Sequence, residues 1–512
     1  MNNRQLMDLL EEIEAEFPVE TWVIDGLHVW PLVRYDVMTR NREMFTRLEA
    51  SSTPKSRLER LRRSAPVTMA EDALRGLRAR RQDEASNAEA NGSRPVDVLL
   101  YSDGISFVQL DGIWVDRFLD PLTDVLRERG LSSLMVTPKS TYFVPRRTPS
   151  LFIQPQLDAV TLRSNLVARL RRGRHVAKLD RFEEARAAIR RRKNSLVVAD
   201  EAQLARVVVY IREYARYFER LLRTTKARLA FNVCYYGGER FAMQLACRAL
   251  GITSIDVQHG GAGDAHWAYR RWVRVPPGGY ALLPDVFWCW SDLEHADILS
   301  WSARLGGLHR PIVGGNLFMD TWQQDDVPYV QRYLERVRAV RSQHPEHRHV
   351  LVTMSGLETD EQLTSLAKVI AASSDRWFWW VRCHPTRLEK RAAVEAALRA
   401  ASASRVAVSE ATEMPLYALL RCVDAHVTEY SSTVIEAAKF GVPSVMIGLD
   451  QAVDYPDLLE SGWMLPVANV DAVVAGLDAQ VARWGRDRES TNASPPPRVR
   501  PEVAELLDTV RR

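Results

Sequence analysis

Short apolar runs alternate with helical patterns along most of this 512-residue chain, beginning at residue 96. The apolar runs are bounded by turn residues, and each one predicts a buried strand. The strands expected on this basis are residues 96–101, 229–234, 252–257, 349–354, 378–383, 405–408, 425–428 and 444–447. Helical patterns lie between the strands, among them residues 118–129, 163–192 and 201–223. This order predicts parallel sheets that are covered by helices on both faces.

The pattern divides the chain into four parts. Residues 1–95 predict a mostly helical amino-terminal extension that ends in a charged linker with Asn, Gly and Pro. Residues 96–312 and 313–485 each predict a Rossmann-like domain, and residues 486–512 predict a proline-rich linker followed by a helix. The expected fold class is therefore α/β, with two Rossmann-like domains that face a cleft.

One segment of the amino-terminal extension has a pattern of its own. Apolar and polar residues alternate through residues 22–34, with Pro31 near the end. This pattern predicts either a docking hairpin or the start of a helix. The sequence assigns the segment no role.

The most informative segment follows the apolar run 425–428. Ser431 and Ser432 offer hydroxyl groups that cap a short helix, which ends at a Gly and a Pro. Free N–H groups and the helix dipole at such a start favour a phosphate against Ser431, Ser432 and Thr433. Glu436, about one turn further along, is placed to accept hydrogen bonds from ribose hydroxyls. The alternative is that the two serines serve only as a helix cap.

A second chemical candidate follows the aromatic run 377–383. His384 and Pro385 come where this strand ends, and ligands of open α/β sheets bind at the carboxyl ends of strands. The imidazole can donate to a phosphate oxygen, and Arg382 and Arg387 add positive charge nearby. We expect this turn and the serine-containing helix start to lie at adjacent strand ends. The alternative is that the His-Pro pair is only a turn.

A third candidate opens after the apolar run 252–257. Gln258 and His259 precede a stretch with three glycines, and Asp264 and His266 follow. The glycines permit close approach of the backbone to a ligand, and the polar side chains supply donors, acceptors and a titratable base. The alternative is a surface loop with incidental histidines.

Together the Gln-His-Gly, His-Pro and Tyr-Ser-Ser segments resemble those of bacterial surface-polysaccharide transferases with the GT-B fold. That group includes capsular and O-antigen Kdo transferases, polysialyltransferases and CDP-glycerol glycerophosphotransferases. The resemblance covers residues 96–481 in element order, with close matching confined to the three segments. It implies that the His-Pro and Ser-Ser elements, here His384, Ser431 and Ser432, hold the donor's phosphate. Glu429 stands where the glycerophosphotransferases commonly have Asp, which favours a sugar transferase.

The expected function is transfer of a sugar from a nucleotide donor to a cell-surface glycan, either lipopolysaccharide O-antigen or capsule. Such a transfer needs a carboxylate or imidazole at the sugar and stabilisation of the departing phosphate. The candidates for base or nucleophile, among which the sequence does not choose, are Asp103, Glu239, His259, Asp264 and His266. The candidates for donor binding are Arg382, His384, Ser431, Ser432, Thr433 and Glu436.

The resemblance ranks a CMP-activated sugar such as CMP-Kdo first as donor and leaves UDP- and GDP-sugars open. Other functions also stay open: a non-hydrolysing UDP-sugar 2-epimerase, a CDP-glycerol-type glycerophosphotransferase, and a non-catalytic glycan-assembly scaffold. The sequence has no clear Asp-x-Asp motif or His/Cys ligand cluster. We therefore expect no metal ion, and no cofactor besides the nucleotide-sugar substrate.

The composition of the chain limits the classes of partner that we expect it to bind. The chain is 46% hydrophobic and 26% charged with a formal net charge of +4, which excludes a disordered protein. Its basic clusters predict solvated helix faces, or surfaces for a membrane or an anionic glycan acceptor. They lack interleaved aromatic residues, and no nucleic-acid-reading module is visible, so we expect no nucleic-acid partner.

Cysteine usage and hydropathy bear on location. The five cysteines have no CxxC spacing and predict reduced, mostly buried thiols. Residues 1–17 do not resemble a signal peptide, and no run is long enough to predict a transmembrane helix. We expect a cytoplasmic protein that contacts the inner membrane only peripherally, where its acceptor is lipid-linked.

Overall fold

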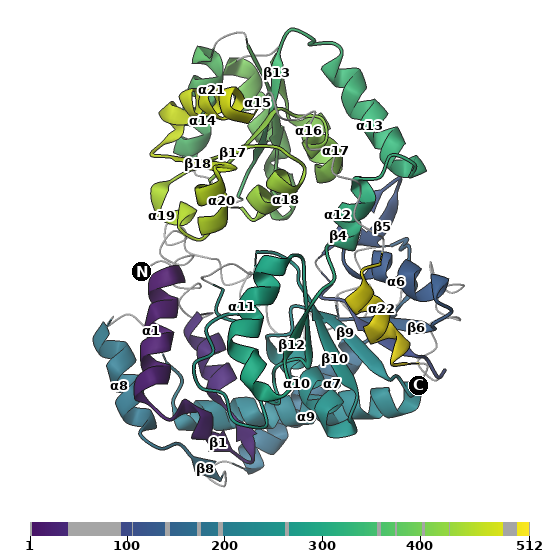
Figure 1. Cartoon of the computed structure of the whole chain (residues 1–512), viewed down its shortest axis with the longest axis vertical. Coiled ribbons are helices and arrows are strands. Elements are labelled where there is room, and N and C mark those ends of the chain that lie inside the picture. Colours follow the sequence, from purple (N-terminus) through teal and green to yellow (C-terminus); the bar gives the residue numbers. More distant parts are fainter. Residues whose placement is uncertain are drawn as a thin grey trace, which may run out of the picture. The chain divides into compact units, whose positions relative to one another are not determined.

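The computed structural model describes residues 3–38, 94–104, 106–138, 144–171, 176–192, 198–261, 266–355, 360–373, 376–401, 405–429, 431–484 and 499–510. The chain folds as two compact units (Figure 1). The amino-terminal unit is built on Gln5–Asn316 together with Val499–Arg512, and the carboxyl-terminal unit on Leu317–Arg498.

The amino-terminal unit is organised around a seven-stranded parallel sheet in the order β12-β11-β10-β9-β3-β6-β7. Strands β3 and β9 are buried at every position, because helices cover both faces of a parallel sheet. The strand order reverses at β3, which has β6 on one side and β9 on the other. The strands are β3 (Val98–Tyr101), β6 (Ser133–Thr137), β7 (Ser150–Phe152), β9 (Leu229–Val233), β10 (Thr253–Val257), β11 (Val286–Cys289) and β12 (Arg310–Val313).

Helices and short hairpins complete this unit. The longest helix among the described residues, α9, starts where Asp200 and Gln203 form a reciprocal capping box, and it ends at Lys226 in the left-handed conformation. The helical elements are α1 (Asn3–Glu16), η1 (Val19–Thr21), α6 (Leu119–Glu128), α7 (Gln154–Leu170), α8 (Phe182–Arg192), α9 (Glu201–Thr225), α10 (Gly238–Leu250), α11 (Asp292–Ser302), η2 (Ala303–Leu305) and α22 (Pro501–Asp508). The remaining strands are β1 (Val23–Ile24), β2 (Leu27–His28), β4 (Phe107–Leu110), β5 (Ile113–Asp116) and β8 (Ala177–Lys178).

The carboxyl-terminal unit has a six-stranded parallel sheet in the order β15-β14-β13-β16-β17-β18. Its strands are β13 (Arg348–Thr353), β14 (Trp377–Arg382), β15 (Val406–Ala407), β16 (Ala425–Thr428), β17 (Ser444–Ile447) and β18 (Met464–Val467). Its helical elements are α12 (Leu317–Trp322), α13 (Pro328–Arg341), α14 (Asp360–Ala372), η3 (Pro385–Lys390), α15 (Arg391–Ala401), α16 (Ser409–Glu413), α17 (Leu416–Leu420), α18 (Thr433–Lys439), α19 (Leu449–Ala452), α20 (Pro456–Ser461), η4 (Val470–Ala472) and α21 (Val473–Trp484). The predicted α/β fold class, with two Rossmann-like parallel sheets, is confirmed.

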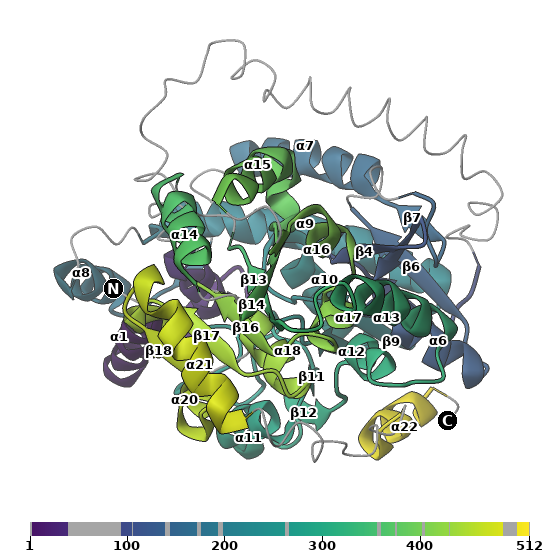
Figure 2. The same cartoon turned by 90° about the horizontal axis from the view of Figure 1, so that it is seen from above.

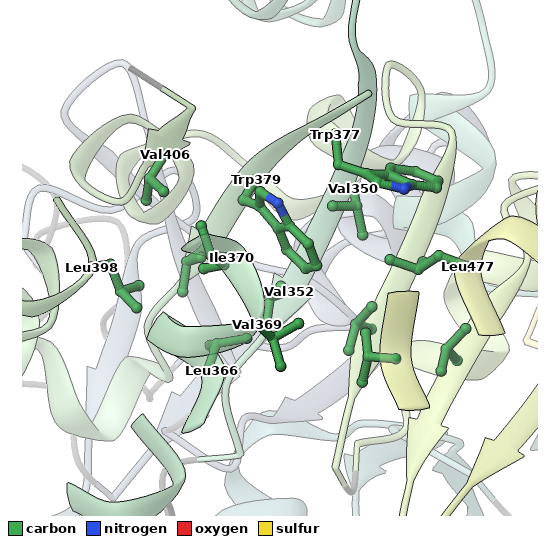
Figure 3. Close-up of a cluster of buried hydrophobic side chains, with 14 of the residues drawn as sticks. Val350, Val352, Leu366, Val369, Ile370, Trp377, Trp379, Leu398, Val406 and Leu477 are labelled. Atoms are coloured by element: carbon green, nitrogen blue, oxygen red, sulfur yellow. The ribbon is translucent and has the colours of Figure 1, made fainter. Parts of the chain in front are cut away.

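The aromatic strand β14 divides its side chains between the two faces of this sheet. Trp377 and Trp379 point into one core, where they meet aliphatic residues of β13, α14, α15 and α21 (Figure 3). Trp380 lies on the opposite face, where its Nε1 donates to His349 Nδ1 at 3.0 Å. Alternation of side chains along a strand explains both placements. Large buried rings on both faces fix the position at which β14 ends and His384 follows.

The described part of the expected amino-terminal extension folds within the amino-terminal unit rather than apart from it. In residues 22–34 both alternatives occur in sequence: β1 and β2 form a hairpin, and a helix begins at Trp30. This segment is held against α1 by a fully buried ion pair, in which Arg34 Nη1 lies 2.7 Å from Glu14 Oε1 and both side chains are inaccessible to solvent. Most of the linker expected near residue 95 lies outside the described residues.

The carboxyl-terminal helix α22 also belongs to the amino-terminal unit, where it contacts β12 (Figure 1). Glu502 accepts a hydrogen bond from the backbone N–H of Val313, and Asp508 pairs with Arg129 at 3.1 Å. No helix in the described parts of the chain combines the length and apolar character needed to cross a bilayer.

Candidate functional site

In the amino-terminal unit, two of the predicted catalytic residues, Asp103 and His259, and a tyrosine that was not predicted lie where the strand order reverses. Asp103 comes two residues after β3, Tyr236 follows β9, and His259 follows β10. These strands are neighbours in the order β10-β9-β3 and run parallel, so their carboxyl ends meet at one edge. Such a topological switch point is where open α/β sheets bind ligands.

Tyr236 links two of the candidates. Its hydroxyl lies 3.3 Å from His259 Nε2 and 3.3 Å from His266 Nε2. We call His259 and His266 the histidine pair. The ring of Tyr236 packs against Trp267 with centroids 4.8 Å apart, which holds the hydroxyl in place. His266 Nδ1 accepts from the backbone N–H of Ala268 at 3.3 Å, so the Nε2 of a neutral His266 carries the proton and donates to Tyr236, whose own hydroxyl proton goes to His259. The sequence analysis did not identify Tyr236, although it follows a predicted strand.

His259 is held neutral. Burial lowers its pKa to about 4, the charges of Arg240 and Arg117 act in the same direction, and the carboxylate of Asp103 opposes them. Its Nδ1 atom is buried and has no hydrogen-bond partner. A neutral imidazole can accept a proton, and the nearby Asp103 charge favours the imidazolium that would form.

Two residues of opposite charge, Glu239 and Arg240, lie at the start of α10, next to the histidine pair. Glu239 accepts a hydrogen bond from the Tyr101 hydroxyl at 3.3 Å. Burial lowers the pKa of Arg240, but Cys234 and the carboxylates of Glu239 and Asp103 raise it more strongly, so its guanidinium is charged. Gly237 has φ of +109°, and a Cβ there would come within 2.9 Å of Arg240 Nη2, so the turn requires glycine. The sequence analysis named Glu239 but missed Arg240.

Asp103 is fixed within its own loop. Its carboxylate accepts hydrogen bonds from the Ser106 hydroxyl at 2.6 Å and from the Ser106 N–H at 2.9 Å, and the residue is 8% exposed. Two further buried acids, Asp116 and Asp120, lie nearby. Burial raises the pKa of Asp116 to about 7, and the negative charge of Asp103 contributes to this rise. Burial also raises the pKa of Asp120 to about 6. Asp264 lies outside the described residues.

The buried ion pair Glu14–Arg34 supports the segment that carries His266. Arg34 Nη2 donates to the carbonyls of Trp267 at 2.8 Å and Arg270 at 3.0 Å. The other carboxylate oxygen of Glu14 accepts from the N–H of Val273 at 2.6 Å. The amino-terminal segment thus fixes the backbone next to the histidine pair, a role that the sequence alone did not assign.

The donor-binding candidates of the carboxyl-terminal unit also lie at strand ends, but not as predicted. His384 follows β14 and Ser431 follows β16, yet β13 lies between these strands in the sheet. The expectation of adjacent strand ends was wrong, because the strand order reverses at β13, with β14 and β15 on one side of it and β16 on the other. Strands are about 4.8 Å apart, which separates the two strand ends by roughly 10 Å.

Most polar groups at the helix start after β16 are engaged within the helix start itself, and the side chain of Ser432 is the exception. The hydroxyl of Ser431 accepts from the Thr433 N–H at 3.2 Å and lies 2.9 Å from the Thr433 hydroxyl. Ser432 is the N-cap residue of α18, but its exposed side chain makes no cap hydrogen bond. The structural alternative, two serines serving as the cap, therefore holds for Ser431 and not for the Ser432 side chain.

Two other candidates in this unit are engaged within the fold. Nη1 of Arg382 donates to the carbonyls of Ala411 at 2.7 Å and Thr412 at 3.2 Å, so the guanidinium secures the end of α16. Glu436 is buried and accepts a hydrogen bond from the Tyr417 hydroxyl. Both arrangements use part of the hydrogen-bonding capacity that the sequence analysis assigned to a nucleotide.

A group of possible metal ligands lies elsewhere in this unit. Within the described residues, ligand atoms of His344, Glu346 and His347 come within 4.8 Å of one another. They precede β13 and so lie at the amino-terminal edge of the sheet, opposite the edge that carries His384. The sequence analysis missed this group, which contains no cysteine. Nδ1 of His347 lies 2.7 Å from a carboxylate oxygen of Glu346.

Comparison with known proteins gives similarities of fold only. No known protein family matches the chain, and no curated protein sequence does. A UDP-N-acetylglucosamine 2-epimerase homologue from Listeria monocytogenes is 14% identical over 81% of this chain and 96% of its own, with a TM-score of 0.45. The wall teichoic acid polymerase TagF is 10% identical over 89% of this chain and 98% of its own, with a TM-score of 0.43. The calicheamicin glycosyltransferase CalG4 is 15% identical over 82% and 98%, with a TM-score of 0.39. At these values the fold assignment rests on the strand orders themselves.

Proposed function

We propose that the chain is a GT-B-type glycosyltransferase that moves a sugar from a nucleotide donor to a cell-surface glycan without a metal ion. The observation that carries the proposal is the histidine pair around Tyr236, at a sheet switch point, with Asp103 and Arg240 beside it. Sugar transfer needs a group that takes a proton from the acceptor hydroxyl, and a neutral imidazole meets that need.

The reaction step assigns a role to each group. The acceptor hydroxyl loses its proton to one imidazole of the histidine pair as its oxygen forms a bond to the anomeric carbon of the donor sugar. The bond from that carbon to the donor phosphate breaks, and its electron pair leaves on the phosphate oxygen. Asp103 stabilises the imidazolium, and Tyr236 holds the pair in position.

In this proposal, residues of the carboxyl-terminal unit bind the nucleotide donor. The exposed Ser432 hydroxyl at the start of α18 would donate to a nucleotide phosphate, and the imidazole of His384, just after β14, would be a second donor. The proposed donor is a CMP-activated sugar such as CMP-Kdo, and the proposed acceptor is a lipopolysaccharide O-antigen or capsular glycan. We infer that the reaction takes place in the cytoplasm.

Nucleotide binding can be tested without knowledge of the acceptor. A ligand that binds only the folded state at ~100 times its Kd raises stability by about 2.7 kcal/mol, which raises the melting temperature. CMP, CDP, UDP, GDP and ADP are compared with the wild-type chain and with Ser432→Ala. The proposal predicts the largest shift with cytidine nucleotides and a smaller shift in the variant. A shift with UDP alone would mean that the donor is a UDP-sugar and not a CMP-sugar. The absence of a shift with any nucleotide would contradict the proposal.

A further inference from the structure

Helix α7 exposes a stripe of leucines. Leu162, Leu166 and Leu170 are 61%, 58% and 69% exposed, and they follow one another at intervals of four residues. Side chains four residues apart lie on one face of a helix. Large apolar side chains are rarely exposed in a row, and such a row marks an interaction surface.

The opposite face of the same helix is already occupied. Leu157, Val160 and Ser164 are buried, and α7 packs along α9 (Figure 2). The Thr161 hydroxyl lies 2.6 Å from that of Tyr214, which fixes the two helices relative to each other. Helix α7 is therefore apolar on two opposite faces, although packing against α9 needs only one of them.

Positive charge borders the exposed stripe. Arg163 and Arg169 lie on its two sides at helical spacing, and Arg171 is exposed just after the helix ends. Asp158 is the one acidic residue of α7, and it accepts a hydrogen bond from Gln154. A cavity of about 440 Å³ is lined by residues of α7 and α9, among them Arg163 and Arg220. Arg163 also pairs with Glu213 at 2.9 Å.

We propose that this face of α7 docks on an anionic phospholipid surface. The leucines enter the boundary between headgroups and acyl chains, and the exposed Arg169 and Arg171 pair with lipid phosphates. Charge complementarity selects this occupant over a second copy of the chain, because a copy would present the same excess of arginines. The proposal goes beyond sugar transfer and does not depend on it.

Sedimentation with vesicles tests the proposal. The full chain is mixed with phosphatidylcholine vesicles, with or without phosphatidylglycerol, at low and high salt. The wild-type chain should sediment with the anionic vesicles and not with the neutral ones, and high salt should release it. The triple variant Leu162→Gln/Leu166→Gln/Leu170→Gln should lose binding by at least about tenfold. Arg169→Gln/Arg171→Gln should weaken it by roughly fivefold for each charge removed.

A matched control distinguishes binding through this leucine stripe from nonspecific adsorption through other exposed apolar side chains. Leu388 and Leu449, in the carboxyl-terminal unit, are 53% and 55% exposed. The variant Leu388→Gln/Leu449→Gln should bind vesicles like the wild-type chain. If the triple variant does not fold, as judged by circular dichroism, the arginine variant and the single change Leu166→Gln carry the test.

Three results would overturn the proposal. The first is absence of vesicle binding by the wild-type chain, and the second is equal binding by the triple variant and the wild type. The third is a wild-type dimer in light scattering that the triple variant loses, which would assign the stripe to a second copy of the chain.

Discussion

Replacing Arg34 with methionine tests how the amino-terminal segment supports the candidate site. The change removes a buried guanidinium and leaves the fully buried carboxylate of Glu14 without its ionic partner. It also removes the hydrogen bonds to the carbonyls of Trp267 and Arg270. Breaking a buried ion pair in this way costs about 3–5 kcal/mol. We expect a loss of that size in the free energy of unfolding of the amino-terminal unit.

The loss should depend on pH in a defined direction. Burial raises the pKa of Glu14 above 4.5, and Arg34 is the largest influence that lowers it. Without Arg34 the folded protein binds a proton at Glu14 more tightly than the unfolded chain does. Stability then falls as the pH rises from the unfolded value toward the folded pKa, so the deficit should be smaller near about pH 5 than near about pH 8.

Urea unfolding and hydrogen exchange together provide the assay. Exchange of the backbone amides in residues 266–274 should accelerate in Arg34→Met, whereas the carboxyl-terminal unit should be unchanged. Arg127→Met is the matched control, because Arg127 is 70% exposed in its pair with Asp124 and its loss should cost about 0–1 kcal/mol. A deficit below about 1 kcal/mol, or unchanged exchange in residues 266–274, would refute the reasoning.

Further changes test other parts of the account. Tyr236→Phe keeps the ring but removes the hydroxyl, so turnover should fall about 100-fold at unchanged melting temperature; unchanged turnover would exclude Tyr236. Ser432→Ala and His384→Ala should each weaken transition-state stabilisation by about 2–4 kcal/mol in steady-state kinetics, and near-normal turnover would remove either residue from the donor site. Burial lowers the pKa of His426 to about 3, so stability should fall as the pH drops below 6.5, and His426→Asn should reduce that slope in pH-dependent melting. EDTA should leave turnover intact, and a strict requirement for added Mg²⁺ or Mn²⁺ would contradict the proposed chemistry.

Local sequence patterns predicted which residues form strands, but they did not predict which strands lie side by side in the sheet. The expected runs 425–428 and 444–447 coincide with β16 and β17, because buried parallel strands are continuous apolar runs between turns. The order of strands is set by packing of helices on both faces, which no single run encodes. For this reason the strand β13 was predicted, but its position between β14 and β16 was not.

The candidate site shows the same division. His259 and His266 stood out because histidines beside glycines are chemically distinctive. Tyr236 and Arg34 did not, because their roles come from contacts with residues far away in the chain. Arg382 seemed free in the sequence, yet it bonds to carbonyls of α16 that only the fold brings near.

The most direct test of sugar transfer is product analysis with the histidine pair intact and removed. CMP-, UDP- and GDP-sugars are incubated with glycan acceptors, and both nucleotide release and acceptor mass are measured. The wild-type chain should release nucleotide only as the acceptor gains a sugar, and His259→Gln/His266→Gln should lose about 10²–10⁴ in rate while nucleotide binding persists. Conversion of the donor to an epimer with no acceptor product, or full turnover in the double variant, would contradict the account.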